Sequence, residues 1–217
     1  MRGLSRAEKI SRLAIRTPEI EKCGVPRVPL LLADPPWQYK HLISDNRRIE
    51  NQYPTMSLED ICAYPAGKLA TDDAVLFLWV PSPLLPEGLQ ALSAWGFNYR
   101  TCMVWVKDKI GMGWWARQQH EQLLIGTRGN PPTPPEARRP PSVIFAPRGR
   151  HSEKPERAYE IIEAMYPEWR DRRVELFARR RRDGWHAIGN ELTSEADVEA
   201  TRRESGHDVR LEQEATP

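Results

Sequence analysis

Short apolar runs separated by polar or amphipathic stretches are the feature that most constrains how this chain can fold. Each run is rich in Val, Leu, Ile and Phe, which is typical of strands buried on both faces. The runs lie at residues 28–33, 74–80, 101–107, 121–127, 142–146 and 173–178. Between them, 86–95 and 155–166 have the pattern of helices, and Ser57 can cap a further short helix. Strands that alternate with helices predict an α/β domain with a mostly parallel sheet.

The chain predicts one domain with a polar segment at each end. Its 217 residues are enough to bury one hydrophobic core. We expect a polar helix at 1–24, the folded domain at 25–192 and a disordered or loosely helical tail at 193–217. The first segment lacks the apolar centre of a signal peptide, and no apolar run is long enough to span a membrane. A cytoplasmic protein without a membrane partner is therefore expected.

The composition argues against several classes of site. The three cysteines, Cys23, Cys62 and Cys102, have no C-x-x-C spacing, and the five histidines are scattered. A disulfide framework, a zinc site or another metal centre is therefore not expected. The formal net charge of +2 excludes a simple polycationic coat protein, but it leaves room for local basic patches.

Polar residues at the ends of the predicted strands mark the expected site. Ligands of parallel α/β sheets bind beyond the carboxyl ends of the strands. Asp34, Pro81, Lys107 and Arg179 follow or close four of the apolar runs. We therefore expect these residues to lie along the edge of the sheet that binds a ligand.

The segment Asp34-Pro35-Pro36-Trp37 has two interpretations. The simpler one is a tight exit loop with Trp37 packed on the core. The functional one starts from an adenine amine, whose lone pair is delocalised into the ring. The Asp34 carboxylate and the Pro35 carbonyl would accept its two N–H groups and favour the form with a localised lone pair. Pro36 would stiffen this catalytic loop, and Trp37 would stack on a base rotated out of its strand.

Further segments extend this motif along the chain in a fixed order. They are residues 32–37, 53–57, 76–80, 104–107, 120–126, 128–131, 151–155, 175–179, 185 and 189–192. With them the chain resembles the adenine-N6 methyltransferases that include the catalytic subunit of the messenger-RNA adenosine methyltransferase. Short DNA-modifying relatives of this family occur in bacteria and phages. The resemblance covers residues 28–192.

The resemblance implies a Rossmann-like, S-adenosylmethionine-dependent methyltransferase fold of permuted order, in which the catalytic loop precedes the donor-binding strand. Lys154 stands where a lysine of the family meets the carboxylate of the donor, S-adenosylmethionine. The full set of implied cofactor-binding residues is Asp34, Lys154, Glu175, Arg179, Asn190 and Glu191. On the substrate side, Tyr53 and Glu121 match family positions, and Trp37, the strand-end residue Lys107 and the loop residue Trp115 complete the predicted contacts.

Some of these residues also have simpler interpretations. Lys154 could be an exposed lysine at a helix start, and Glu175 a carboxylate at a sheet edge. Trp114 and Trp115, in a loop with glycines, are open between core packing and substrate contact. The arginines at 179–182 depart from the eukaryotic family pattern; they could be a solvated run or contact phosphates beside the cofactor. The family often has Gln where Glu191 stands.

The predicted activity is methyl transfer from S-adenosylmethionine to N6 of adenine in DNA. The same chemistry on adenosine in RNA is the alternative, because the sequence shows neither an RNA-binding module nor a separate target-recognition domain. A catalytically silent nucleic-acid-binding partner is a third hypothesis, against which the intact Asp34, Trp37 and Lys154 argue. Since the chain leaves no room for a large recognition domain, a homodimer or a recognition partner stays open.

Overall fold

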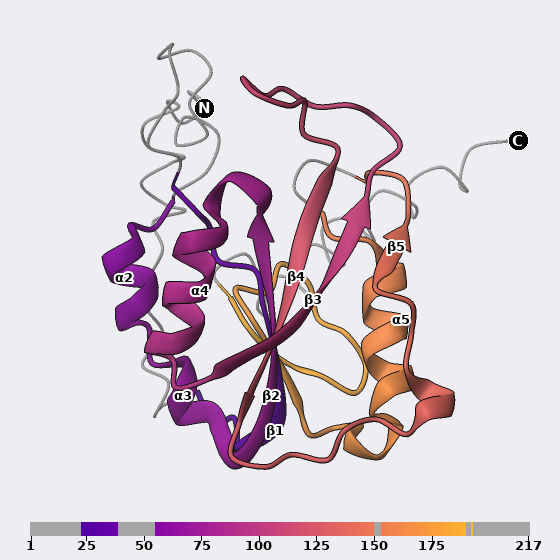
Figure 1. Cartoon of the computed structure of the whole chain (residues 1–217). Helices are drawn as coiled ribbons and strands as arrows, with labels where there is room; N and C mark the ends of the chain where they lie inside the picture. Colours follow the sequence, from indigo (N-terminus) through magenta and orange to yellow (C-terminus); the bar gives the residue numbers. More distant parts are fainter. Residues whose placement is uncertain (1–22, 39–54, 150–152, 190–191, 193–217) are drawn as a thin grey trace, which may run out of the picture.

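A single sheet organises the part of the chain that the computed structural model describes, residues 23–38, 55–149, 153–189 and 192 (Figure 1). Its strands are β1 Val28–Ala33, β2 Ala70–Pro81, β3 Asn98–Val106, β4 His120–Arg128, β5 Val143–Phe145, β6 Arg173–Leu176 and β7 His186–Ile188. Their order in the sheet is β5-β3-β4-β2-β1-β6-β7. The strand β4 is antiparallel to both neighbours, and every other pairing in this sheet is parallel. The predicted α/β class with a mostly parallel sheet is confirmed.

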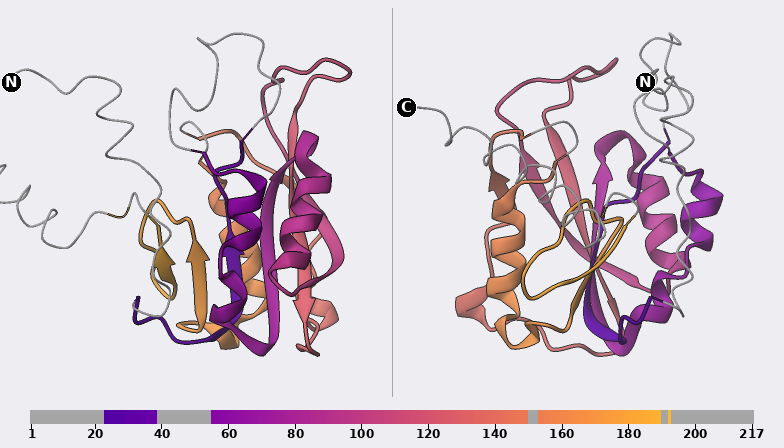
Figure 2. Two further views of the ribbon diagram at one scale, coloured as in Figure 1. Left: turned by 90° about the vertical axis from the view of Figure 1, so that its left-hand side faces the viewer. Right: turned by 180° about the vertical axis from the view of Figure 1, so that it is seen from behind.

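Helices cover both faces of the sheet (Figures 1 and 2). They are α2 Leu58–Ala63, α3 Ala66–Leu69, α4 Leu85–Ala94 and α5 Glu156–Met165, with short 3-10 turns η4 Ser82–Leu84, η5 Glu136–Arg138 and η6 Pro167–Trp169. The first three helices pack on one face, and α5 packs on the other. As predicted, Ser57 caps α2, because its side chain accepts a hydrogen bond from the Asp60 N–H.

The two faces of the central strands enter two different apolar clusters. Leu31 and Leu76 lie in the cluster beneath α2 and α4, whereas Leu32 and Phe77 lie in the cluster beneath α5. Because successive side chains of a strand point to opposite faces, a strand covered on both sides must be apolar at every position. This requirement explains the uninterrupted apolar runs of the sequence.

The predicted strands are all present, and all except β1 have shifted ends. Strand β2 begins at Ala70 rather than at residue 74, because the polar residues that follow Ala70 stay at the exposed start of the strand. Two short elements, α3 and β7, were not predicted, since three or four residues carry too little of a hydrophobic period. The antiparallel direction of β4 was also not predicted.

The chain reverses its direction of travel across the sheet between β1 and β6. From β1 it moves to β2 on one side, whereas from β6 it moves to β7 on the other. The loops that leave two such neighbouring strands diverge, and the crevice between them is the usual ligand site of an open α/β sheet. Asp34 and Phe177 are the first residues beyond these two strand ends.

Candidate active site

The loop at residues 34–37 leaves β1 next to the carboxyl end of the neighbouring strand β6. The Asp34 N–H lies 3.5 Å from the carbonyl oxygen of Leu176, the last residue of β6. Within the loop, the Trp37 N–H donates to the Pro35 carbonyl at 2.8 Å. A carbonyl oxygen has two lone pairs, so the Pro35 oxygen retains one with which it can accept a ligand N–H.

Trp37 and Pro36 fix the far end of this loop. The Trp37 indole Nε1 donates to the Trp79 carbonyl at 2.9 Å, and its side chain is only 6% exposed. The Met56 N–H donates to the Pro36 carbonyl at 2.8 Å, which ties the loop to the segment before α2. This packing is what the simpler interpretation of Trp37 predicted. Stacking of the ring on a base remains a prediction.

Four of the predicted site residues form one continuous network of charges. Lys154 Nζ lies 2.8 Å from Asp34 Oδ1 and 3.3 Å from Glu121 Oε2. Glu121 Oε1 lies in turn 2.5 Å from Lys107 Nζ. These side chains come from the end of β1, the segment before α5, the start of β4 and the residue after β3. Lys154 is thus a largely enclosed partner of two carboxylates, and the exposed lysine of the simpler interpretation is not observed.

Burial and pairing pull the pKa values of this network in opposite directions. Burial raises the pKa of Asp34 above its ordinary value, although Lys154 opposes the shift. Burial alone would lower the pKa of Lys154, but the charges of Asp34 and Glu121 outweigh it and raise that pKa. Burial would raise the pKa of Glu121, yet Lys154 and Lys107 lower it. Lys154 therefore stays a cation at neutral pH, and the pKa values of Asp34 and Glu121 shift in opposite directions from their ordinary values.

Glu175 lies inside the protein rather than at a sheet edge. It belongs to β6, which has a neighbour on each side, and it is 7% exposed. The Tyr159 hydroxyl on α5 donates to Glu175 Oε1 at 2.7 Å. Burial raises the pKa of Glu175, and the bond from Tyr159 opposes the shift. The edge interpretation of Glu175 is wrong, whereas its role as a donor ligand remains a prediction.

The turn that leaves β6 has an unusual backbone. Phe177 has a φ of 61°, in the left-handed region that residues other than glycine rarely adopt. The Ala178 N–H donates to the Ile188 carbonyl at 2.9 Å. A Cβ on Gly189 would lie 1.9 Å from the Ala178 carbonyl oxygen, so only glycine fits there. Strained backbone of this kind is concentrated at ligand sites.

The remaining predicted cofactor residues follow this turn. Arg179 is the third residue beyond β6, and its charge opposes the rise in the pKa of Asp34 that burial causes. Asn190 and Glu191, as well as the substrate-side Tyr53, lie outside the described residues.

Two arginines of the run at 179–182 are engaged by acids of α5. Arg180 Nη2 lies 2.5 Å from Glu156 Oε2, and Arg182 contacts Glu156 as well. Arg182 Nε also lies 2.6 Å from Glu163 Oε1. The run is therefore not simply solvated: it fastens the loop after β6 to the helix that follows Lys154.

Two residues of this region were not predicted. Tyr159 binds Glu175 and lies beneath Arg182, whose guanidinium carbon is 4.8 Å from the ring centroid. The Trp185 indole donates to Glu163 at 2.8 Å. In the sequence, Tyr159 looked like one more apolar position of an amphipathic helix, so only the pairing of α5 with β6 reveals its polar role.

Trp115 lies outside the network of charges. It is fully exposed, and Trp114 beside it is 83% exposed. Of the two interpretations of Trp114 and Trp115, core packing is therefore wrong. Lys107 and Glu121, which flank the loop that carries them, belong to the network.

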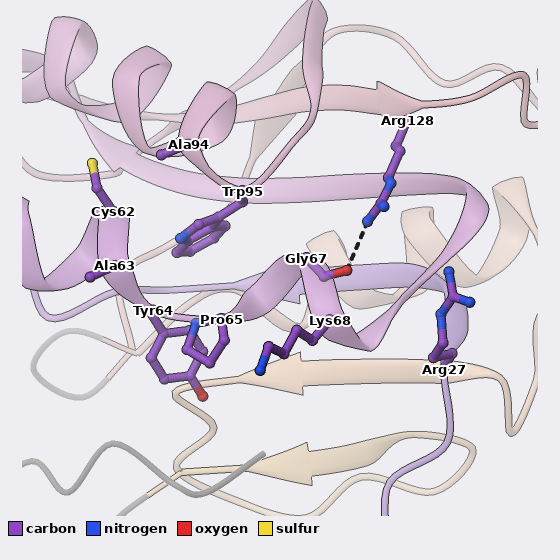
Figure 3. A pocket seen from close by; sticks show the side chains of 10 residues that line it. All are labelled: Arg27, Cys62, Ala63, Tyr64, Pro65, Gly67, Lys68, Ala94, Trp95 and Arg128. Atoms are coloured by element: carbon purple, nitrogen blue, oxygen red, sulfur yellow. Dashed lines mark hydrogen bonds between the residues drawn. The ribbon is translucent and has the colours of Figure 1, made fainter. Parts of the chain in front are cut away.

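A hollow of about 530 Å³ lies beside α2, α3 and the end of α4 (Figure 3). Its lining includes Arg27, which precedes β1, and Arg128, which ends the antiparallel β4. Arg128 Nη1 donates to the Gly67 carbonyl at 2.8 Å, and Arg27 is paired with Asp72 at 2.6 Å. Tyr64 also lines the hollow, and its ring centroid lies 4.7 Å from that of Phe177, the first residue beyond β6.

The described residues contain no cluster of His, Cys, Asp and Glu that could hold a metal ion. Within the same residues, no helix has the length and apolar character needed to cross a bilayer.

The fold and this crevice define a methyltransferase of the MT-A70 family. The model of that family matches residues 28–191, so the match starts with β1 and takes in all seven strands. The chain belongs to the MT-A70 family, as the resemblance predicted, and the family is one of S-adenosylmethionine-dependent methyltransferases.

Individual relatives agree with the family match. The chain is 30% identical to the type II methyltransferase M.MunI of a Mycoplasma species, over 75% of this chain and 77% of that protein. It is 31% identical to the N(6)-adenosine-methyltransferase MT-A70-like protein of Arabidopsis thaliana and 30% identical to METTL3 of Homo sapiens, an N(6)-adenosine-methyltransferase catalytic subunit. It spans only 23% and 28% of these two longer proteins.

Proposed function

We propose that this methyltransferase transfers the methyl group of S-adenosylmethionine to N6 of adenine in DNA. The observation that carries the proposal is the pairing of Asp34 with Lys154 at 2.8 Å, in the crevice between the ends of β1 and β6. A family match alone would be compatible with a silent relative. An intact Asp-Pro-Pro-Trp loop together with this ion pair supports a working enzyme.

The residues of the crevice fit the charged end of the donor. The amino acid part of S-adenosylmethionine carries a carboxylate and an ammonium group, which match the cation of Lys154 and the anion of Asp34. Arg179 and the buried Glu175 lie on the neighbouring strand end for the ribose and adenine part. The close contact of Gly189 with Ala178 leaves the backbone there free of side chains. When bound, the donor supplies an electrophilic methyl group.

Asp34 and Pro35 would hold the target amine. The carboxylate and the free lone pair of the Pro35 carbonyl are two acceptors on one fixed loop, and an exocyclic amine has two N–H donors. Accepting both hydrogens keeps the nitrogen lone pair directed away from the loop. Such positioning lowers the barrier without a covalent intermediate. Asp34 or a water molecule would take the proton released on transfer, and the raised pKa of Asp34 suits that step.

The relatives favour DNA over RNA as the substrate. A type II methyltransferase belongs to a class of DNA-modifying enzymes, and it matches this chain over 77% of its own length. The N(6)-adenosine-methyltransferases match over less than a third of theirs. RNA is the second candidate, because those relatives are N(6)-adenosine-methyltransferases by name and match 75% of this chain.

Mass spectrometry of nucleosides tests the proposal. Cells that express the protein should gain N6-methyldeoxyadenosine in DNA, whereas Asp34→Asn, which keeps the shape of the side chain, should leave none. Asp72→Asn is the matched control, because Asp72 pairs with Arg27 at the opposite edge of the sheet. N6-methyladenosine in RNA alone would assign the second substrate, and equal levels in wild type and Asp34→Asn would refute the catalytic role of Asp34.

A further inference from the structure

A hairpin at residues 107–119, here called the tryptophan hairpin, extends beyond the ends of β3 and β4 (Figure 1, top). Its strands are joined by hydrogen bonds from the Lys107 N–H to Gln119 at 2.8 Å and from the Gly111 N–H to Gln118 at 2.6 Å. The Gln118 N–H returns a bond to Met112 at 3.0 Å. The hairpin therefore has a defined shape of its own.

Glycines give the tip this shape. A Cβ on Gly113 would lie 1.9 Å from the Ala116 carbonyl oxygen, and one on Gly111 would lie 2.8 Å from that of Gln118. The chain thus bends more sharply at the tip than a larger residue allows. The two residues carried by this bend are Trp114 and Trp115.

The hairpin exposes its largest apolar side chains. Ile110 is 52%, Met112 73%, Trp114 83% and Trp115 102% exposed. Large exposed apolar groups gathered on one short element mark a surface that meets a partner. A fixed hairpin that holds them out loses little conformational entropy on binding.

The charges around the hairpin fit a polyanion. Lys109 and Arg117 lie on it, and the exposed Arg148 lies beside it, where its N–H donates to Asp108 at 2.9 Å. Asp108 is the single acid at residues 108–119. A basic collar around aromatic rings matches a nucleic acid better than an apolar protein surface, which would gain nothing from the cations.

The position of the hairpin relates it to the target base. Lys107 and Glu121, at its two ends, belong to the network that holds Lys154 and Asp34. The N6 amine of a paired adenine must leave the stack before it can reach such a crevice, and unstacking costs a few kcal/mol per base step. Apolar side chains that fill the vacated space offset this cost.

We propose that Trp114 and Trp115 form a wedge that enters the DNA duplex beside the target adenine and stabilises the gap that the rotated base leaves. The inference rests on the proposed function, and it assigns the exposed rings to base rotation rather than to binding of phosphates or of the donor. The wedge matters for duplex DNA only, since a base in single-stranded DNA is already free to rotate.

The test compares methyl transfer to an unmethylated linear plasmid with transfer to the same DNA after heat denaturation. The double variant Trp114→Ala/Trp115→Ala should lose roughly tenfold or more on the duplex, the scale of one lost stacking contact, and much less on denatured DNA. Trp114→Phe/Trp115→Phe should retain most of the activity. Tyr99→Ala, which removes an exposed aromatic at the other end of β3, should behave as wild type.

Equal losses on both forms of DNA, or no loss on the duplex, would overturn the wedge. A change in the sedimentation coefficient between wild type and the double alanine variant would do so too, because the hairpin would then hold a second copy of the chain. If wild type methylates neither form, the proposed function fails, and binding decides the wedge separately. Wild type should then bind a fluorescein-labelled duplex lacking one base more tightly than the intact duplex, and the double variant should lose that preference.

Discussion

Removing the cation of Lys154 tests the central network most directly. Lys154→Met keeps the length of the side chain but leaves Asp34 and Glu121 facing each other without the charge between them. Both lost ion pairs are largely enclosed, with side-chain exposures of 11% for Lys154, 20% for Asp34 and 18% for Glu121. Breaking a buried pair by removing one partner costs about 3–5 kcal/mol.

The lower end of this range is expected. Glu121 keeps Lys107 at 2.5 Å, and Arg179 still acts on Asp34. We therefore expect a loss of about 3 kcal/mol in the free energy of unfolding at pH 7, which corresponds to a fall of roughly 6–12 °C in Tm for a domain of this size. Arg157→Met is the matched control on α5, because the Arg157–Glu160 pair is 61% and 50% exposed and such pairs contribute about 0–1 kcal/mol.

The change of this stability loss with pH has a definite direction. Lys154 lowers the pKa values of Asp34 and Glu121, so both values rise in the folded variant, and the penalty is smallest at low pH and grows as pH rises through them. The difference between wild type and Lys154→Met should therefore be largest at pH 7 and shrink towards pH 4. Urea unfolding followed by tryptophan fluorescence measures it. A difference near zero at pH 7, or one that grows on acidification, would refute the coupling.

Two further substitutions probe the loop after β6. Arg182→Met removes ion pairs to Glu156 and Glu163 and should lower the free energy of unfolding by about 1–2 kcal/mol. Both acids have lowered pKa values in the folded protein, so this contribution to stability is present above pH 4.5 and is lost as pH falls below it. Urea midpoints at pH 7 and pH 4 check this, and equal losses at both would contradict it. Gly189→Ala places a Cβ 1.9 Å from the Ala178 oxygen and should lower Tm by several degrees. Gly24→Ala, at a glycine with a φ of 68° where a Cβ would meet no atom within 4 Å, is strained by its backbone alone and should lower Tm less.

The sequence predicted the strands well because strands that are buried on both faces appear in it as uninterrupted apolar runs. Strand β1 needs an apolar residue at every position, and its predicted and observed ends coincide at Val28 and Ala33. The direction of β4 leaves no such trace, since an antiparallel strand buried on both faces is as apolar as a parallel one. Strand β7 is too short for any period.

The sequence indicated which residues belong to the candidate site, but it did not indicate which of them contact one another. The chemistry of a carboxylate and a proline carbonyl after a buried strand selected Asp34 and Pro35. That Lys154 sits between Asp34 and Glu121 depends on the pairing of distant strands, which spacing along the chain cannot show. The partners of the arginines after β6 could not be predicted for the same reason: Glu156 and Glu163 become their neighbours only when α5 packs across the sheet.

The order of the elements explains why the site depends on the whole domain. The Asp-Pro-Pro-Trp loop follows the first strand, the turn at Phe177 follows β6, and Lys154 lies between them in the sequence, so the crevice closes only when the two ends of the domain meet. Its central contact, Asp34 with Lys154, joins residues that lie far apart in the sequence. A chain that ended before β6 would therefore retain Asp-Pro-Pro-Trp on β1 but lose the second wall of the crevice. The Asp-Pro-Pro-Trp motif therefore identifies the loop after β1, and the order of the strands brings the other residues of the crevice next to that loop.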